Sequence, residues 1–397
     1  MTRPTVSLIV PTFNRAKYLA TAIESLVAQT YKFDELLIVD DGSTDNTPQI
    51  VAGLPGNPKY FRKENGGRAA AINLGVRHAK GDLIWIFDDD DVALPDALAT
   101  LIAPFLAGNV DFVYSPWYLC NELPDGSLEV AGTSEVQTAS GKAFFHEMLY
   151  RCFTQGNAML IARRCYDEVG PMREDLIRSQ DHEFMLRLGR RFDAVPVPVP
   201  TFYWRRHQGP RGAGNGNMFA AAKLNRNWHI YRQMIFVDVH RDLPVQEYLP
   251  VYRQAEFPGN LREARITRAV VMSCHGLWHL AIPEIVEVAE TMPGTPLTPR
   301  ERSELRHLST LLTSDSLIDL AAAPEQARRI VKLGSTEIGR VFVDHIVRAA
   351  YWHFRKQWQD QERSGALEVL RALFSGLGIA PVARATFGHL LGRNVAV

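Results

Sequence analysis

The chain has 397 residues, of which 46% are hydrophobic and 22% are charged, as is usual for a folded globular protein. This length exceeds what one ordinary hydrophobic core holds, so we expect two domains. The formal net charge is zero at pH 7, whereas nucleic-acid-binding proteins usually have an excess of positive charge. We therefore expect no nucleic-acid partner.

The four cysteines are scattered without a CxxC pair, which argues against a disulfide framework and a zinc site and fits a reducing cytosol. The first apolar run is too short for a signal peptide, and no run of about 20 apolar residues predicts a transmembrane helix. We therefore expect a cytoplasmic protein, with peripheral contact at the inner face of the membrane as the alternative.

Residues 1–110 alternate between strand and helix patterns. Strands are predicted at 6–11, 35–40, 59–62 and 82–87, and helices at 15–29, 47–54, 67–79 and 95–106. Thr47 is the expected N-cap of the second helix and Pro48 its first residue. This alternation predicts an α/β fold with a mostly parallel sheet and helices on both faces, and such sheets bind ligands beyond the carboxyl ends of their strands.

The pattern changes in the second half of the chain. Proline at every second position in 196–200 excludes a helix there, and the glycine-rich segment 208–217 is of the kind that can move over a ligand. Helical periodicity dominates from residue 218 onward. We therefore predict a first domain over 1–217 and a mostly α-helical domain over 218–397.

The helical stretches 347–358 and 370–393 mix apolar residues with arginine, lysine and histidine. They are consistent with core helices, with a homo-oligomer interface or with a face on the membrane surface. The helical domain would accordingly serve acceptor binding, oligomerisation or membrane contact.

Four consecutive aspartates, Asp88 to Asp91, follow the strand predicted at 82–87. Alternate side chains of a loop can point the same way, so Asp88 and Asp90 can share a hard divalent cation such as Mg²⁺ or Mn²⁺. Such a cation usually completes its coordination with substrate phosphates. The alternatives are a solvated acidic turn and a capping cluster for the next helix.

Two further motifs carry groups that suit a nucleotide. Asp40 and Asp41 end a predicted strand, where a carboxylate can accept from a uracil-type imide or from ribose hydroxyls; the alternative is an Asx-turn. Arg68 follows two glycines in the first turn of a helix, where backbone N–H groups and a guanidinium suit a diphosphate. Taken alone, Arg68 is equally consistent with a surface arginine.

Together, "PTFN", "VDDGSTDNT", "NGGRAAAINLG", "FDDDDVALP" and "SQDHEFMLRL" resemble, in order and spacing, a family 2 glycosyltransferase of the GT-A fold. The resemblance covers residues 5–210. It implies inverting transfer of one sugar from a nucleotide-diphosphate sugar, usually UDP-linked, to a hydroxyl of a carbohydrate or lipid-linked acceptor, with Mn²⁺ or Mg²⁺ as cofactor. It also implies a role in polysaccharide or glycoconjugate synthesis at the cell envelope. Since the chain has no Gln-x-x-Arg-Trp motif, we expect a non-processive enzyme.

The resemblance assigns roles to individual residues. Nucleotide-sugar contacts fall on Pro11, Thr12, Asn14, Asp40, Asp41, Arg68, Asp88, Asp89, Asp90 and Arg205, and metal contacts on Asp88, Asp90 and His207. The family's base is an acid in a Glu-Asp pair at a helix start; here the pair is Gln180-Asp181, so Asp181 is the expected base. The acceptor side would comprise Gly156, Asn157, His182 and Trp204.

Two other hypotheses remain. Residues 84–92 contain an apolar strand followed by D-x-D-x-V, the motif of haloacid-dehalogenase-type phosphatases, but that family places it on the first strand and here other strands precede it. A catalytically decayed sugar-nucleotide-binding scaffold is the non-enzymatic alternative, and Gln180 in place of the family's acid is the feature that suggests it.

Overall fold

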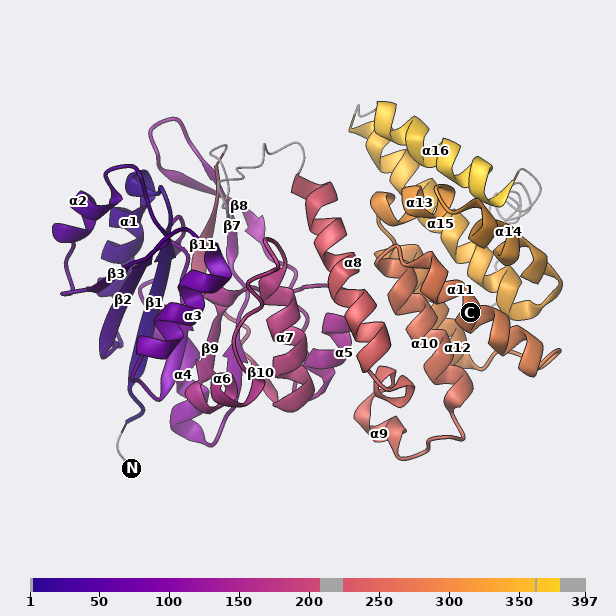
Figure 1. Ribbon diagram of the computed structural model, residues 1–397, viewed down its shortest axis with the longest axis horizontal. Coiled ribbons are helices and arrows are strands. Elements are labelled where there is room, and N and C mark those ends of the chain that lie inside the picture. The colour runs from indigo at the N-terminus through magenta and orange to yellow at the C-terminus, as the bar shows by residue number, and fades with distance from the viewer. Residues whose placement is uncertain (1–2, 208–223, 361–362, 379–397) are drawn as a thin grey trace. The chain divides into compact units, whose positions relative to one another are not determined.

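Residues 3–207, 224–360 and 363–378 are described by a computed structural model (Figure 1). The chain divides into two units, Met1–Trp228 and His229–Val397, and the division falls inside α8 (Leu224–Asp242). The boundary expected after residue 217 and the glycine-rich segment 208–217 lie outside the described residues.

The first unit is built on a seven-stranded sheet. In spatial order its strands are β10 (Ala194–Pro196), β6 (Phe112–Tyr114), β9 (Met159–Ala162), β4 (Leu83–Ile86), β1 (Val6–Thr12), β2 (Glu35–Asp40) and β3 (Lys59–Arg62). Neighbouring strands run parallel except at β9, which is antiparallel to β4 and β6. Both β1 and β4 are buried along their whole length, as expected for apolar strands covered on both faces.

The helices of the first unit alternate with these strands along the chain. They are α1 (Ala16–Val27), α2 (Thr47–Ala52), α3 (Arg68–His78), α4 (Ala97–Ala107), α5 (Ala143–Tyr150), α6 (Arg163–Val169) and α7 (Gln180–Arg191), with a 3-10 turn η1 (Gly156–Ala158) before β9. Gly75 lets α3 lie close on β1, because a Cβ there would be 2.5 Å from Ile9 Cγ2. The predicted fold class, a mostly parallel α/β sheet followed by a helical region, is confirmed.

The elements predicted in residues 1–110 are all present, and their ends differ from the predictions by two residues at most. The N-cap of α2 was wrongly predicted: it is Asn46, and Thr47 is already helical. The reason lies in the preceding loop, where Asp45 Oδ1 accepts a hydrogen bond from Thr47 N at 3.0 Å and so satisfies the first turn.

A second, smaller sheet begins directly after the acidic run. Its order is β5 (Val92–Ala93), β11 (Phe202–Arg206), β7 (Tyr118–Glu122) and β8 (Leu128–Thr133). β11 is antiparallel to β5 and parallel to β7. Pairing with β5 brings the residues at the end of β11 next to the four aspartates.

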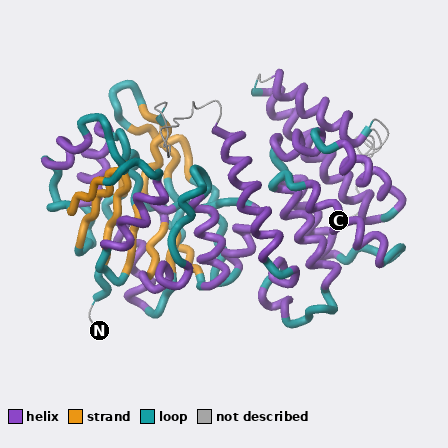
Figure 2. Tube along the Cα trace, viewed as in Figure 1, coloured by secondary structure: helices purple, strands orange, loops and turns teal. Residues whose placement is uncertain are grey.

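In the described part of the second unit, all regular elements are helices (Figure 2). After α8 come η3 (Val245–Tyr248), α9 (Val251–Gln254), α10 (Leu261–Cys274), α11 (Trp278–Thr291), α12 (Pro299–Leu311), α13 (Ser314–Ala321), α14 (Pro324–Lys332), η4 (Leu333–Ser335), α15 (Glu337–Gln359) and α16 (Arg363–Leu377). Within the described ranges, every helix is too short or too polar to cross a bilayer.

A buried histidine makes the stability of the second unit depend on pH. His345 on α15 is buried, and its Nδ1 has no hydrogen-bond partner among the described residues. Burial, reinforced by the charges of Arg348 and Arg306, lowers the pKa of His345 to about 4. An unfolded histidine titrates near pH 6.5. Between these values the unfolded chain binds a proton that the folded chain does not, so stability is lost as the pH falls.

We predict that protonation of His345 lowers the free energy of unfolding of the second unit by about 3 kcal/mol when the pH falls from neutral to the folded pKa of this histidine. A His345→Leu variant should lose this pH dependence, whereas His279→Leu, at an exposed position, should keep it. Urea unfolding followed by circular dichroism across this pH range measures the effect. Equal slopes of stability against pH in the two variants would show that His345 is not the titrating group.

Candidate functional site

The carboxyl ends of β1, β2 and β4 lie side by side because the three strands are parallel neighbours. Thr12, the last residue of β1, pairs with Asp40, the last residue of β2. Ile9 pairs with Ile86, the last residue of β4, and only Phe87 separates Ile86 from the acidic run. The loops after these strands therefore open at one edge of the sheet. They carry the three polar motifs "PTFN", "DDGS" and "DDDD", as the order of strands in the sequence predicted.

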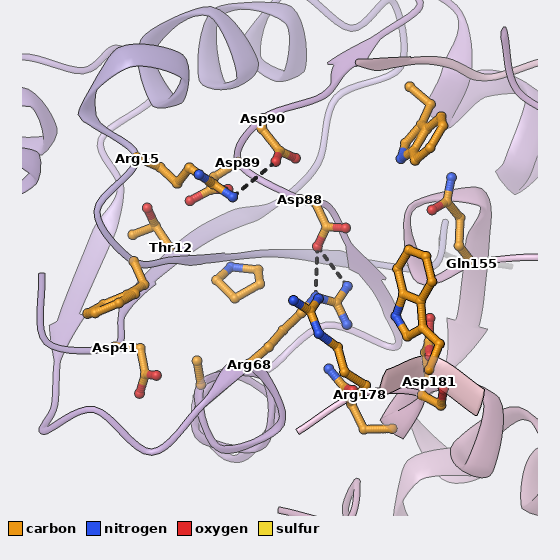
Figure 3. Close-up of a pocket in the computed structure, with 17 residues that line it drawn as sticks. Thr12, Arg15, Asp41, Arg68, Asp88, Asp89, Asp90, Gln155, Arg178 and Asp181 are labelled. Carbon is orange, nitrogen blue, oxygen red and sulfur yellow. Dashed lines mark hydrogen bonds and ion pairs between the residues drawn. The ribbon is translucent and has the colours of Figure 1, made fainter. Parts of the chain in front are cut away.

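The loops border a cavity of about 270 Å³ (Figure 3). Its wall is completed by the start of α3, the segment before η1, the first turn of α7 and part of β11. The lining residues are Pro11, Thr12, Phe13, Arg15, Asp41, Arg68, Ala71, Asp88, Asp89, Asp90, Gln155, Arg178, Ser179, Gln180, Asp181, Trp204 and Trp228.

Arg68 holds the first aspartate of the run. Its Nε and Nη2 donate to Asp88 Oδ1 at 3.0 and 2.7 Å, as Figure 3 shows. Arg68 is the first residue of α3, and Gly67 before it has a φ of 92°, which favours glycine. The two glycines ahead of the helix thus set the direction from which the guanidinium enters the cavity.

The next two aspartates meet a second arginine and a histidine. Asp89 Oδ1 lies 3.8 Å from Arg15 Nε, and Asp90 Oδ2 lies 3.6 Å from Arg15 Nη2 and 3.0 Å from His207 Nε2. Asp89 Oδ2 is buried and has no hydrogen-bond partner among the described residues. Burial raises the pKa of Asp88, and burial together with repulsion from Asp90 raises the pKa of Asp89 well above its usual value.

Negative charge exceeds positive charge on the cavity wall. Five carboxylates and three guanidinium groups line it. Lys63 Nζ, 2.8 Å from Asp41 Oδ1, compensates one carboxylate from outside the lining. Four carboxylates then face three guanidinium groups, and one buried oxygen of Asp89 is unpartnered in the described structure. Carboxylates therefore outnumber guanidinium groups on the wall.

The acidic loop fits a hard divalent cation. Carboxylate oxygens are the ligands that Mg²⁺ and Mn²⁺ prefer, and Mg²⁺ is usually held by one or two carboxylates together with phosphates and water. Within the described residues, no group of three or more His, Cys, Asp or Glu side chains is arranged to hold a metal ion. Asp88 and Asp90 are the residues that would hold such an ion.

Asp41, and not Asp40, lies on the cavity wall. Asp41 accepts hydrogen bonds from the backbone N–H groups of Gly66 and Gly67 at 2.9 and 2.7 Å. Asp40 is fully buried, and its Oδ2 accepts from Tyr60 Oη at 2.5 Å. Successive side chains at a strand end point to opposite sides, so only one of the two aspartates can face the ligand side.

Two other expected nucleotide contacts lie behind the wall. Asn14 Oδ1 accepts from Thr44 N at 2.7 Å and so joins the loops after β1 and β2. Arg205 is buried, and its Nε donates to the carbonyl oxygen of Asp90 at 2.9 Å. Both side chains support loops that border the cavity, and neither lines it.

The four expected acceptor-side residues separate in the structure. Trp204 lines the main cavity, and Gly156 lines a hollow of about 10 Å³ that also borders Asp181. His182 is buried with its Nε2 2.8 Å from the carbonyl oxygen of Met148, because its position on α7 faces α5. His182 therefore lies behind the wall of the main cavity and does not line it.

Asn157 clamps both ends of the acidic run instead of facing an acceptor. It is fully buried; its Oδ1 accepts from Asp88 N at 3.0 Å, and its Nδ2 donates to Asp91 Oδ2 at 2.6 Å. Its carbonyl oxygen accepts from Trp85 Nε1 at 2.9 Å. Asp91 Oδ1 in turn accepts from Arg205 N at 2.9 Å. The fourth aspartate is therefore an internal support, and the first three face the cavity.

Asp181 stands in the first turn of α7, at the other end of the cavity from Arg15 in Figure 3. Its Oδ1 accepts from His182 N at 2.9 Å. The residue before the helix, Ser179, has a φ of 59°, a left-handed conformation that is uncommon for serine. That turn directs the start of α7 toward the cavity.

Sequence reasoning missed Arg15, Gln155 and Arg178, which also line the cavity. Arg15 follows "PTFN" directly, and its position beside a motif could have indicated it. Gln155 and Arg178 stand in no recognisable pattern, and only the fold brings them to the site.

Residues 7–150 match the family model described as glycosyl transferase family 2, and this segment contains the loops after β1, β2 and β4. The matched segment is a glycosyltransferase family 2 domain. The family match, with the acidic run after the fourth strand and not the first, argues against the phosphatase hypothesis.

Relatives of this chain include an uncharacterized glycosyltransferase of Rickettsia felis, 30% identical over 265 residues that cover 65% of this chain and 43% of that protein. Chondroitin synthase of Pasteurella multocida is 32% identical over 189 residues, which cover 47% of this chain and 19% of the synthase. The matched region thus spans less than half the length of either relative.

A solved structure shares the fold. Residues 1–349 of S. aureus TarS, crystallised in complex with UDP-GlcNAc, align with a TM-score of 0.50 and 16% identity, covering 90% of this chain and 92% of that one. The family 2 match and this likeness together agree with the GT-A architecture expected from the sequence.

We predict that Asn157→Ala lowers the free energy of unfolding of the first unit by about 3 kcal/mol, because it removes the hydrogen bonds that its side chain makes to the buried Asp91 Oδ2 and to the Asp88 N–H. Asn121→Ala, at an exposed position on β7, is the matched control and should change it little. Guanidinium unfolding measures both. Similar midpoints for the two variants would mean that Asn157 does not support the acidic loop.

Proposed function

We propose that the chain is a metal-dependent, inverting glycosyltransferase that moves one sugar from a nucleotide-diphosphate sugar, with UDP as the first carrier to test, to an acceptor hydroxyl. The observation that carries the proposal is the shared cavity of a family 2 domain. Asp88, Asp89 and Asp90 lie at one end, with a buried unpartnered oxygen in the described structure, and Asp181 lies at the other.

The donor would occupy the end of the cavity near the acidic loop. Arg68, at the N-terminus of α3, and Arg15 offer guanidinium groups and a helix terminus to the diphosphate. A divalent cation held by Asp88 and Asp90, with His207 beside Asp90, would neutralise charge that develops on the leaving diphosphate. Asp41 and Thr12 would border the nucleoside.

Asp181 would act as the general base. It would take the proton of the acceptor hydroxyl while that oxygen forms a bond to the anomeric carbon and the bond from that carbon to the diphosphate oxygen breaks. Attack from the face opposite to the diphosphate inverts the configuration. Trp204, Trp228 and Gln155 line the cavity and offer aromatic and amide groups to an acceptor sugar.

We further propose a carbohydrate or lipid-linked acceptor and a role in polysaccharide or glycoconjugate synthesis at the cell envelope. A relative named chondroitin synthase supports a carbohydrate product. The first unit would carry out the transfer, and the helical unit would serve acceptor binding, oligomerisation or membrane contact.

A thermal-shift panel of UDP-, dTDP- and GDP-sugars, each with and without Mn²⁺, tests the donor class, because a ligand stabilises the state that binds it. We expect sugars of one base to raise the unfolding temperature, and more so with Mn²⁺. Slow release of the nucleoside diphosphate without added acceptor then separates an enzyme from a decayed scaffold, which would bind the donor but release nothing. No shift with any donor would contradict the proposed function.

We predict that Asp181→Asn lowers the transfer rate by at least about a hundredfold, since the amide cannot accept the acceptor's proton. Its donor affinity, measured by calorimetry, should stay within the range of the wild type. Asp167→Asn, at an exposed position on α6, is the control. A variant at Asp181 with near-normal turnover would refute its role as base.

We predict that EDTA stops transfer and that Mn²⁺ or Mg²⁺ restores it, because the carboxylates of the acidic loop repel a diphosphate that arrives without a cation. Asp90→Asn should need a higher concentration of Mn²⁺ to reach half of its own maximal rate. Full turnover in the presence of EDTA would contradict the metal assignment.

A further inference from the structure

One face of α15 exposes three aromatic side chains together with cations. Tyr351, Trp352 and Trp358 are 46%, 54% and 48% exposed, and they are among the large apolar residues most open to solvent in the described second unit. Arg355 and Lys356 are exposed between them. Spacings of three, four and seven residues place these side chains on one face of the helix.

The opposite face of the same helix is part of the core. Phe342, Ile346, Ala349 and Ala350 are buried there, and α15 packs on α12 and α16. The exposed aromatic side chains are therefore not needed to bury α15. A group of exposed aromatic rings usually marks a surface that binds a partner or a membrane.

The exposed face is electropositive. From His345 to Gln359 the helix contains no acidic residue, while Arg348, Arg355 and Lys356 are all exposed. The cations also contact the rings: Lys356 Nζ lies 5.2 Å from the centroid of the Trp352 ring. An anionic partner would therefore meet cations and aromatic rings at the same time.

The next helix extends this character. Arg363 Cζ, at the start of α16, lies 5.6 Å from the centroid of the Trp358 ring. Along α16, Leu367 and Phe374 are each 43% exposed, and Arg371 is exposed as well. Asp360 and Glu368 are exposed in the same stretch, so apolar, basic and acidic side chains all occur beyond the end of α15.

We propose that this face of α15 binds the surface of a bilayer that contains anionic phospholipids. Tryptophan and tyrosine have an apolar ring and a polar N–H or O–H group, which suits the headgroup layer, and arginine and lysine bind the phosphates there. A protein partner would have to bury these cations and pair each one. On a bilayer the cations stay among the lipid phosphates while the aromatic rings enter the interface between headgroups and acyl chains.

This surface lies on the second unit and requires nothing of the sugar-transfer site. The helix would lie on the membrane and not cross it, since none of the described helices is long and apolar enough to span a bilayer. If the proposed function also holds, the contact would bring a lipid-linked acceptor to the enzyme's surroundings.

Sedimentation of the full chain with vesicles tests the proposal. We expect binding to phosphatidylcholine mixed with phosphatidylglycerol, at least about tenfold weaker binding to phosphatidylcholine alone, and loss of binding as sodium chloride is raised. Arg355→Glu/Lys356→Glu should weaken binding at least about tenfold, because one surface cation contributes about a fivefold factor. Trp352→Ala/Trp358→Ala should also weaken it at least about tenfold, because two aromatic rings no longer enter the interface.

Tyr252→Ala/Arg300→Glu removes an exposed ring and an exposed cation elsewhere in the same unit and should bind like the wild type. Unfolding midpoints and turnover of all variants should match those of the wild type, which separates a lost surface from a lost fold or a lost active site. Equal binding to both vesicle types, or equal losses in the control, would overturn the proposal. So would light scattering that shows a wild-type dimer which the α15 variants lose, since the face would then join two copies of the chain.

Discussion

Four adjacent carboxylates behind a buried strand repel one another, and the structure of the first unit is arranged around that repulsion. Arg68 reaches Asp88 from α3, Arg15 reaches Asp89 and Asp90 from the start of α1, and His207 reaches Asp90 from the end of β11. Elements far apart in the sequence therefore meet at one loop. The carboxylates on the cavity wall outnumber the guanidinium groups there, which supports the proposal that the loop binds a cation.

The four aspartates divide into two kinds. Asp91 turns inward and is held by Asn157 Nδ2 and Arg205 N, so that it fixes the loop rather than binding a ligand. Asp88, Asp89 and Asp90 face the cavity. Burying the Asp91 carboxylate costs little free energy because each of its oxygens accepts a hydrogen bond. One oxygen of Asp89 has no such bond in the described structure. One motif thus supplies both a buried support for the loop and the carboxylates that face the cavity.

Sequence was sufficient where a local pattern determines the structure. The strands 35–40 and 59–62 were predicted to the residue, and parallel order then placed the loops after β1, β2 and β4 together. It was insufficient where tertiary contacts decide. The choice between Asp40 and Asp41 depends on strand orientation, and the inward turn of Asn157 depends on a contact with a strand some 70 residues away in sequence. The expected roles of the remaining site residues stay predictions.

The central claim is that the acidic loop binds one divalent ion jointly with a nucleoside diphosphate. Titration of Mn²⁺ followed by electron paramagnetic resonance measures this directly, since bound and free Mn²⁺ give different signals. We predict one bound ion per chain, tighter binding when the nucleoside diphosphate is present, and loss of that ion in Asp88→Asn/Asp90→Asn. Mn²⁺ that stays free with and without the diphosphate, or that binds equally to this variant, would contradict the account.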